Sequence, residues 1–137
     1  MRFSCLVLLV GFLPGCWEKS VATTSVHGHV YFHDRPLNRG TIVFAPDAER
    51  GAKGELAKAE IQPDGSYVLL GKNAAPIAPG WHRVTILALE AATSSGAVEN
   101  FREPRSLIPD RYRDPNLSDI AVEVIPDQEN IKDFHLD

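Results

Sequence analysis

Short runs of alternating apolar and polar residues, separated by glycine and proline, limit the fold of this chain more than any other feature. In residues 26–33, VHGHVYFH, the side chains of Val26, Val30 and Phe32 fall on one side, and Tyr31 and three histidines fall on the other. A period of two is typical of a half-buried β-strand. The chain contains ten glycines and ten prolines and no long amphipathic helical pattern, so we expect strands and turns.

Further strands follow along the chain. Residues 34–40 have the composition of a turn, and we expect them to join the first strand to a returning strand as a hairpin. Residues 63–66, PDGS, are an Asp-Gly turn signal that predicts a second hairpin. The expected strands are 26–33, 41–44, 57–61, 67–70, 81–89, 117–125 and 131–136. About seven short strands at this spacing predict an all-β fold, a single antiparallel β-sandwich.

Two connections between these strands are longer. Residues 47–56 are polar and are expected to form a surface loop, whereas residues 90–116 look irregular. A connection of that length inside a compact domain is usually functional or locally packed. If it packs, Leu107, Ile108 and Tyr112 are its expected anchors.

The first 16 residues differ from the rest. Met1 and Arg2 give a singly positive start, and the eleven apolar residues 3–13 match the size of a signal peptide. They are well short of the ~20 residues that span a bilayer. The segment ends in Leu13-Pro14-Gly15-Cys16, which resembles the lipobox of bacterial lipoproteins, although proline is not the usual residue at its second position. The alternatives are a buried N-terminal strand with a chance cysteine, a signal peptide without lipidation, and an uncleaved anchor.

The lipobox resemblance implies a division of the chain into three parts. Residues 1–15 would be a lipoprotein signal peptide, residues 16–25 a lipidated Cys16 with its tether, and residues 26–137 the β-sandwich domain. Cys5 would leave with the leader, so the mature domain would have no disulfide. The tether would reach at most about 30 Å, at ~3.3 to 3.6 Å per residue. The expected location is therefore the bacterial cell envelope, lipid-anchored in the membrane and facing the periplasm or the cell surface.

The turn and core motifs also resemble a known family. They are Gly28-x-Val30-x-Phe32, Pro36-Leu37-x-x-Gly40-x-Ile42-x-Phe44-x-Pro46, Asp64-Gly65-Ser66-Tyr67, Pro79-Gly80-x-His82-x-Val84-x-Ile86 and Leu107-Ile108-Pro109-x-x-Tyr112. The first four motifs are similar to the carboxypeptidase-regulatory-like domains. The last, followed by Ser118 and a terminal Phe134-x-Leu136, is similar to the small lipoproteins of that type abundant in planctomycetes. The resemblance implies a transthyretin-type sandwich. It implies no peptidase activity.

Catalytic and nucleic-acid-binding signatures are missing from the sequence. It contains no Gly-x-Ser-x-Gly, no His-Glu-x-x-His and no phosphate-binding loop. It ends in residues 134–137, FHLD, and lacks the Tyr-Arg-Gly-Ser ending of the transthyretin-type enzymes that hydrolyse 5-hydroxyisourate. The formal net charge of −4 gives no support to nucleic-acid binding. We therefore expect a non-enzymatic structural or interaction module without catalytic residues or cofactors, and a glycan-binding or metal-binding accessory lipoprotein is the alternative.

His27 and His29 are the candidate metal ligands. Residues two apart on a strand point the same way and lie about 6.6 Å apart, so both imidazoles could reach one metal ion. The same pattern fits two polar residues on the solvent face of a sheet.

Arginines and aromatic residues gather in the irregular segment. Arg102, Arg105, Arg111 and Arg113 with Tyr112 could bind carboxylated or phosphorylated glycans of the envelope. Three acidic residues lie among them, so a self-paired surface loop is the alternative. Trp81, expected on the outward face of its strand, is a further candidate contact residue, and ordinary edge packing is its alternative. Envelope proteins are the other partners we consider.

Overall fold

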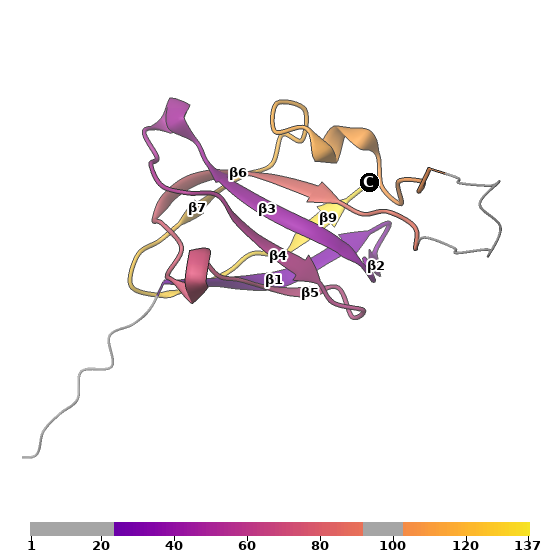
Figure 1. The fold of residues 1–137 in the computed structure, drawn as a ribbon, viewed down its shortest axis with the longest axis horizontal. Helices are drawn as coiled ribbons and strands as arrows, with labels where there is room; N and C mark the ends of the chain where they lie inside the picture. Colours follow the sequence, from indigo (N-terminus) through magenta and orange to yellow (C-terminus); the bar gives the residue numbers. More distant parts are fainter. Residues whose placement is uncertain (1–23, 92–102) are drawn as a thin grey trace, which may run out of the picture.

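The computed structural model describes residues 24–91 and 103–137 of the chain. These residues form an all-β fold in which two sheets face each other, a β-sandwich with nine strands and three short 3₁₀ turns (Figure 1). The predicted fold class is confirmed, with nine strands where the sequence suggested about seven. Among the described residues, no helix is long and apolar enough to cross a membrane.

The first sheet is built around β1, Ser25–Phe32. Antiparallel strands β5 (Ser66–Leu69) and β2 (Arg35–Pro36) pair along one edge of β1. Strands β8 (Glu129–Ile131) and β9 (Phe134–Leu136) pair in parallel along the other edge, β8 with the first half of β1 and β9 with the second half. These parallel pairs depart from the expectation of a wholly antiparallel sandwich.

The second sheet is antiparallel and has the order β4–β3–β6–β7. Its strands are β3 (Gly40–Pro46), β4 (Ala57–Ile61), β6 (Gly80–Leu87) and β7 (Ala121–Val124). The predicted alternation of residues 81–89 is confirmed, because His82, Val84, Ile86 and Ala88 are all buried.

The first predicted hairpin is wrong in its partner strand. His33 and Asp34, both with positive φ, make a tight turn that returns the chain only into the short β2. Leu37 is then buried in the core, and the chain crosses to the other sheet before β3 begins. The strands before and after residues 34–40 therefore face each other across the core and do not pair.

The second predicted hairpin is correct only in its turn. Gly65 has a φ of 84° and its N–H donates to the Gln62 carbonyl over 2.8 Å. The strands on either side then separate, because β4 pairs with β3 and β5 pairs with β1. A single bridge between Lys58 and Leu70 joins them farther along.

The C-terminal strand predicted at 131–136 is divided in two. Residues Lys132 and Asp133 pass so close to β1 that a Cβ on Gly28 would lie 2.0 Å from the Lys132 carbonyl oxygen. Backbone at this distance can face only glycine. The crossing is fixed by Tyr67, whose hydroxyl donates to that carbonyl over 2.6 Å. Burial raises the pKa of Tyr67, so it remains a donor at neutral pH.

The core lies between the two sheets. Inward side chains of the first sheet meet those of the second, with Tyr67 and Phe134 beside Phe44 at ring centroid distances of 6.4 and 6.1 Å. Its largest fully buried aliphatic side chains are Val26, Val30, Ile42, Leu69, Val84, Ile86 and Val124. Ile108 and Tyr112 are buried and Leu107 packs against the core, so the predicted anchors of the irregular segment are confirmed.

Candidate functional site

His27 and His29 lie on the outward face of β1, as their alternation predicted, and each faces a carboxylate of its own. His27 Nε2 is 3.5 Å from Glu129 Oε1, and His29 Nδ1 is 3.7 Å from Asp133 Oδ1. Asp133 Oδ1 also accepts the His29 backbone N–H over 2.7 Å. In residues 24–91 and 103–137, no group of three or more His, Cys, Asp or Glu could hold a metal ion. A metal-binding role for these two histidines stays a prediction.

Aromatic rings continue this face toward the far end of β1. The rings of His29 and Tyr31 stack with centroids 6.0 Å apart, and those of Tyr31 and His135 stack at 4.8 Å. The outward side chains in this half of the sheet therefore contact one another.

The arginine segment is brought together only in part. Arg102 lies outside the described residues. Arg105 and Arg113 line one hollow of about 540 Å³ together with Asp110, and Arg113 Nη2 is 3.4 Å from Asp110 Oδ1. Cationic and anionic groups thus share the hollow, as the self-paired alternative expected for this segment.

Arg111 and Tyr112 lie on the 3₁₀ turn η3 (Asp110–Arg113) and hold the C-terminal residue. The Tyr112 hydroxyl donates to Asp137 Oδ1 over 2.7 Å, and Arg111 forms an ion pair with the same carboxylate. The Tyr112 hydrogen bond and the Arg111 charge lower the pKa of Asp137. Since Tyr112 is buried and Arg111 already engages a carboxylate, both close the sandwich here; ligand binding by them stays a prediction.

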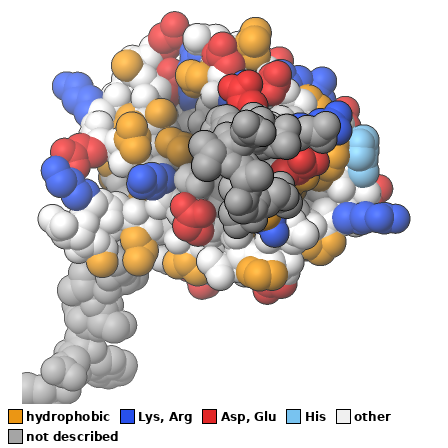
Figure 2. All heavy atoms as spheres, turned by 45° about the vertical axis from the view of Figure 1, so that its right-hand side comes forward, with side chains coloured by type: hydrophobic (Ala, Val, Ile, Leu, Met, Phe, Trp, Pro, Cys, Tyr) orange, Lys and Arg blue, Asp and Glu red, His pale blue; other side chains and the backbone are white. Residues whose placement is uncertain are grey.

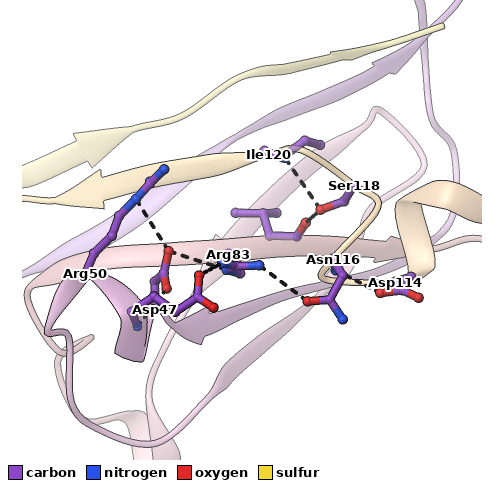
Figure 3. Close-up of polar contacts among 9 residues, drawn as sticks. Asp47, Arg50, Arg83, Asp114, Asn116, Ser118 and Ile120 are labelled. Carbon is purple, nitrogen blue, oxygen red and sulfur yellow. Dashed lines mark hydrogen bonds and ion pairs between the residues drawn. The ribbon is translucent and has the colours of Figure 1, made fainter.

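Trp81 belongs to a different cluster, which the sequence did not reveal. Its ring is partly exposed and lies under Arg50, whose guanidinium carbon is 4.5 Å from the ring centroid. Arg50 Nε is 3.6 Å from Asp47 Oδ2, and Arg83 Nε is 3.4 Å from the same oxygen (Figure 3). The predicted outward position of Trp81 is therefore confirmed, with Arg50 and Asp47 as its neighbours.

Asp47 is the centre of this cluster and is buried, although it falls in the stretch expected to be a surface loop. It caps the 3₁₀ turn η1 (Ala48–Arg50) by accepting the Glu49 N–H over 3.1 Å. Aspartate is a preferred N-cap residue, and acidic residues such as Glu49 are enriched in the first turn; this was the available sequence signal.

Arg83 ties this turn to the segment after η3. Its guanidinium contacts Asp47, Glu49 and Asn116, and the Asn116 N–H in turn bonds Asp114 Oδ1 (Figure 3). Because each of its three guanidinium nitrogens contacts a side chain of the domain, Arg83 holds the two connections together. On the face shown in Figure 2, basic and acidic side chains are likewise interspersed.

One buried side-chain nitrogen has no hydrogen-bond partner among the described residues. It is His82 Nε2, on the inner face of β6 beside Phe44. His82 Nδ1 lies 3.0 Å from the Gly80 carbonyl, which makes it the donor nitrogen of a neutral imidazole. Burial lowers the pKa of His82, so the neutral form is retained at pH 7.

No protein-family model, curated protein or solved structure matches this chain. The resemblance of its motifs to carboxypeptidase-regulatory-like domains stays a prediction.

Proposed function

We propose that this protein is a non-enzymatic, lipid-anchored β-sandwich of the bacterial cell envelope that acts as a structural or interaction module. The observation that carries the proposal is the leader, with Arg2 before an apolar stretch that ends in Leu13-Pro14-Gly15-Cys16. A leader of this kind directs export, and several lipid chains on one cysteine anchor a protein stably.

The start of the domain supports this proposal. Thr24 Oγ1 accepts the Asp127 N–H over 3.0 Å, and the Ser25 N–H reaches the Gln128 carbonyl over 3.4 Å. The described part of the domain thus begins at Thr24, eight residues after Cys16. A linker that short keeps the domain within about 30 Å of an anchor at Cys16.

Acylation of Cys16 is the test. Cells that express the full chain are labelled with a palmitate analogue, and the wild type should be labelled and recovered with the membranes. Cys16→Ser should lose both the label and membrane retention, whereas Cys5→Ser should keep both because Cys5 leaves with the leader. Equal labelling of the wild type and Cys16→Ser would refute the proposal.

Glycan binding is the second candidate, and the hollow shared by Arg105 and Arg113 favours it. If the hollow binds an anionic envelope polymer, the protein should be retained on isolated cell-wall material and released by salt. Arg105→Ser with Arg113→Ser should then abolish retention, whereas Arg35→Ser with Arg39→Ser should preserve it. If the protein is an anchored module only, the wild type and both double variants should be retained on cell-wall material to the same extent.

A further inference from the structure

Exposed apolar side chains gather at the end of the sandwich where the chain enters the domain. Leu56, Val68, Leu70, Ile125 and Ile131 are between 45 and 63% exposed. We call these five residues the N-terminal patch. Figure 1 shows the start of β1, the 3₁₀ turn η2 (Lys72–Ala74) and the loop between β7 and β8 at this same end.

The register of the first sheet places three of these residues beside one another. His27 pairs with Val68 on one side and with Ile131 on the other, so the three form one row across the outward face. Leu70 follows Val68 by two residues and lies about 7 Å farther along the same face. Because Val26 pairs with Leu69, Leu70 lies level with Ser25, the first residue of β1.

Leu56 and Ile125 extend the patch on either side. Leu56 lines a hollow of about 570 Å³ with Leu70 and Ala57. Ile125 is held by Asn130, whose Oδ1 accepts its N–H over 2.8 Å and whose Nδ2 donates to the Ser25 carbonyl over 3.3 Å. The patch therefore surrounds the residues through which any N-terminal anchor is connected.

We propose that the N-terminal patch rests on the lipid surface to which the protein is anchored. This inference depends on the proposed function, because it needs an anchor at or near Cys16. The linker holds the patch at a high effective concentration beside the membrane. Leucine, valine and isoleucine side chains gain free energy when they leave water for the boundary between head groups and acyl chains.

The charges around the patch favour apolar contact over attraction to anionic lipid. Lys72 Nζ is 3.7 Å from Glu55 Oε1. Lys58 lines the same hollow as Leu56 and Leu70, and Glu129 lies beside Ser25, one row away from Val68 and Ile131. Positive and negative groups are thus balanced at the rim. Docking should therefore be similar on zwitterionic and anionic membranes and should change little with salt.

The experiment supplies the anchor chemically, so it does not depend on acylation in the cell. The full chain with Cys5→Ser is coupled through Cys16 to a maleimide lipid in phosphatidylcholine vesicles that contain a head-group spin label. Methyl NMR signals of Val68, Leu70 and Ile131 should lose intensity, whereas those of Leu87 and Leu117, which are also exposed, should keep it.

Paired variants then test the contact itself. Leu56→Ser with Leu70→Ser should restore the Val68 and Ile131 signals, and the matched control Leu87→Ser with Leu117→Ser should leave them weakened. Both variants change exposed positions, so an unchanged spectrum without vesicles checks that they fold. A uniform loss of intensity over all methyl signals would overturn the inference, and so would a loss that the Leu56 and Leu70 changes do not alter. Neither result would bear on acylation of Cys16.

Two other occupants of the patch give distinct results. Concentration-dependent shifts of the patch methyls without vesicles would mean that the patch binds a second copy of the chain. Exposure of these methyls to a water-soluble spin label only after deletion of residues 3–13 would mean that the leader covers them. Either result would overturn the inference.

Discussion

The two ends of the sandwich are closed by different chemistry. At the end where the chain enters, the buried amide of Asn130 joins Ser25, Ile125 and Gln128 by uncharged hydrogen bonds. At the opposite end, the Asp137 carboxylate is held by Arg111 and Tyr112. The exposed side chains also differ, because the leucine, valine and isoleucine side chains of the N-terminal patch surround the first end, whereas His29, Tyr31 and His135 stack together toward the second.

This difference is consistent with the proposal that one end of the sandwich contacts a membrane surface and the other faces water. Uncharged hydrogen bonds tolerate a boundary of low dielectric constant, where a lone charge would be costly. An exposed ion pair contributes little in water and is screened by salt.

Gly28→Ala should have the largest effect on stability, because the added Cβ would displace the backbone of Lys132, which crosses over Gly28 between β8 and β9. A Cβ would lie 2.0 Å from the backbone oxygen of Lys132, which cannot move without breaking its bond to Tyr67. We expect a loss of about 3 kcal/mol or more in the free energy of unfolding, measured in urea. Gly51→Ala is the control: its Cβ would meet no atom within 4 Å, and only its left-handed φ of 77° would cost stability, about 1 kcal/mol. Equal losses in the two variants would contradict the close approach at Gly28.

Asn130→Asp should come next and should act on the N-terminal end alone. The change removes the Nδ2 donor to the Ile125 and Gln128 carbonyls and places a buried carboxylate opposite them. We expect a loss of about 2 to 3 kcal/mol by urea unfolding. Asn116→Asp makes the same chemical change at an exposed site, where the side-chain oxygen accepts from Arg83, and should be close to neutral. A mild effect at Asn130 would mean that its hydrogen bonds do not hold this end.

Acid should weaken the domain through His82, which lies near the start of β6, where Gly80 pairs with Val124. Its folded-state pKa is lowered by burial, so below pH ~6.5 the unfolded chain binds more protons than the native state. Stability should fall as the pH decreases from 7 to 5, by at most about 1.4 kcal/mol per pH unit for one group. His82→Leu should flatten this part of the profile, measured by urea unfolding at several pH values. An identical slope in the variant would assign the acid sensitivity to other groups.

Arg111→Ser should have the smallest effect and should act on the opposite end. It removes an exposed ion pair with Asp137, so we expect a small decrease in the thermal midpoint that disappears at 1 M salt. Tyr112→Phe removes the hydroxyl that lies between Arg111 and Asp137 and is the companion variant. A large loss on Arg111→Ser that persists in high salt would contradict the ionic closure of this end.

Local alternation and turn chemistry could predict the faces of β1 and β6 because these patterns depend only on neighbouring residues. The partner of each strand could not be predicted. Leu37 is buried between the sheets, and the crossing over Gly28 depends on Lys132, which is far away in sequence. Long-range pairing is decided by which apolar faces meet in the core, and a period of two does not contain that information.

The candidate sites show the same limit. Spacing placed His27 and His29 on one face, but their carboxylate partners come from the C-terminal segment that pairs with β1 through β8 and β9. The cluster around Asp47 joins three separate segments, and a polar stretch of sequence gives no reason to expect a buried aspartate. The N-terminal patch is assembled in the same way, from residues at four places in the sequence: just before β4, in and just after β5, just after β7, and on β8.

Anchoring of the sandwich through Cys16 is tested most directly by the intact mass of the protein purified from cell membranes. We expect the mass of residues 16–137 plus the added mass of lipid, with all of the added mass on the N-terminal peptide that begins at Cys16. The mass of the full chain from Met1, or that of residues 16–137 without any addition, would contradict it.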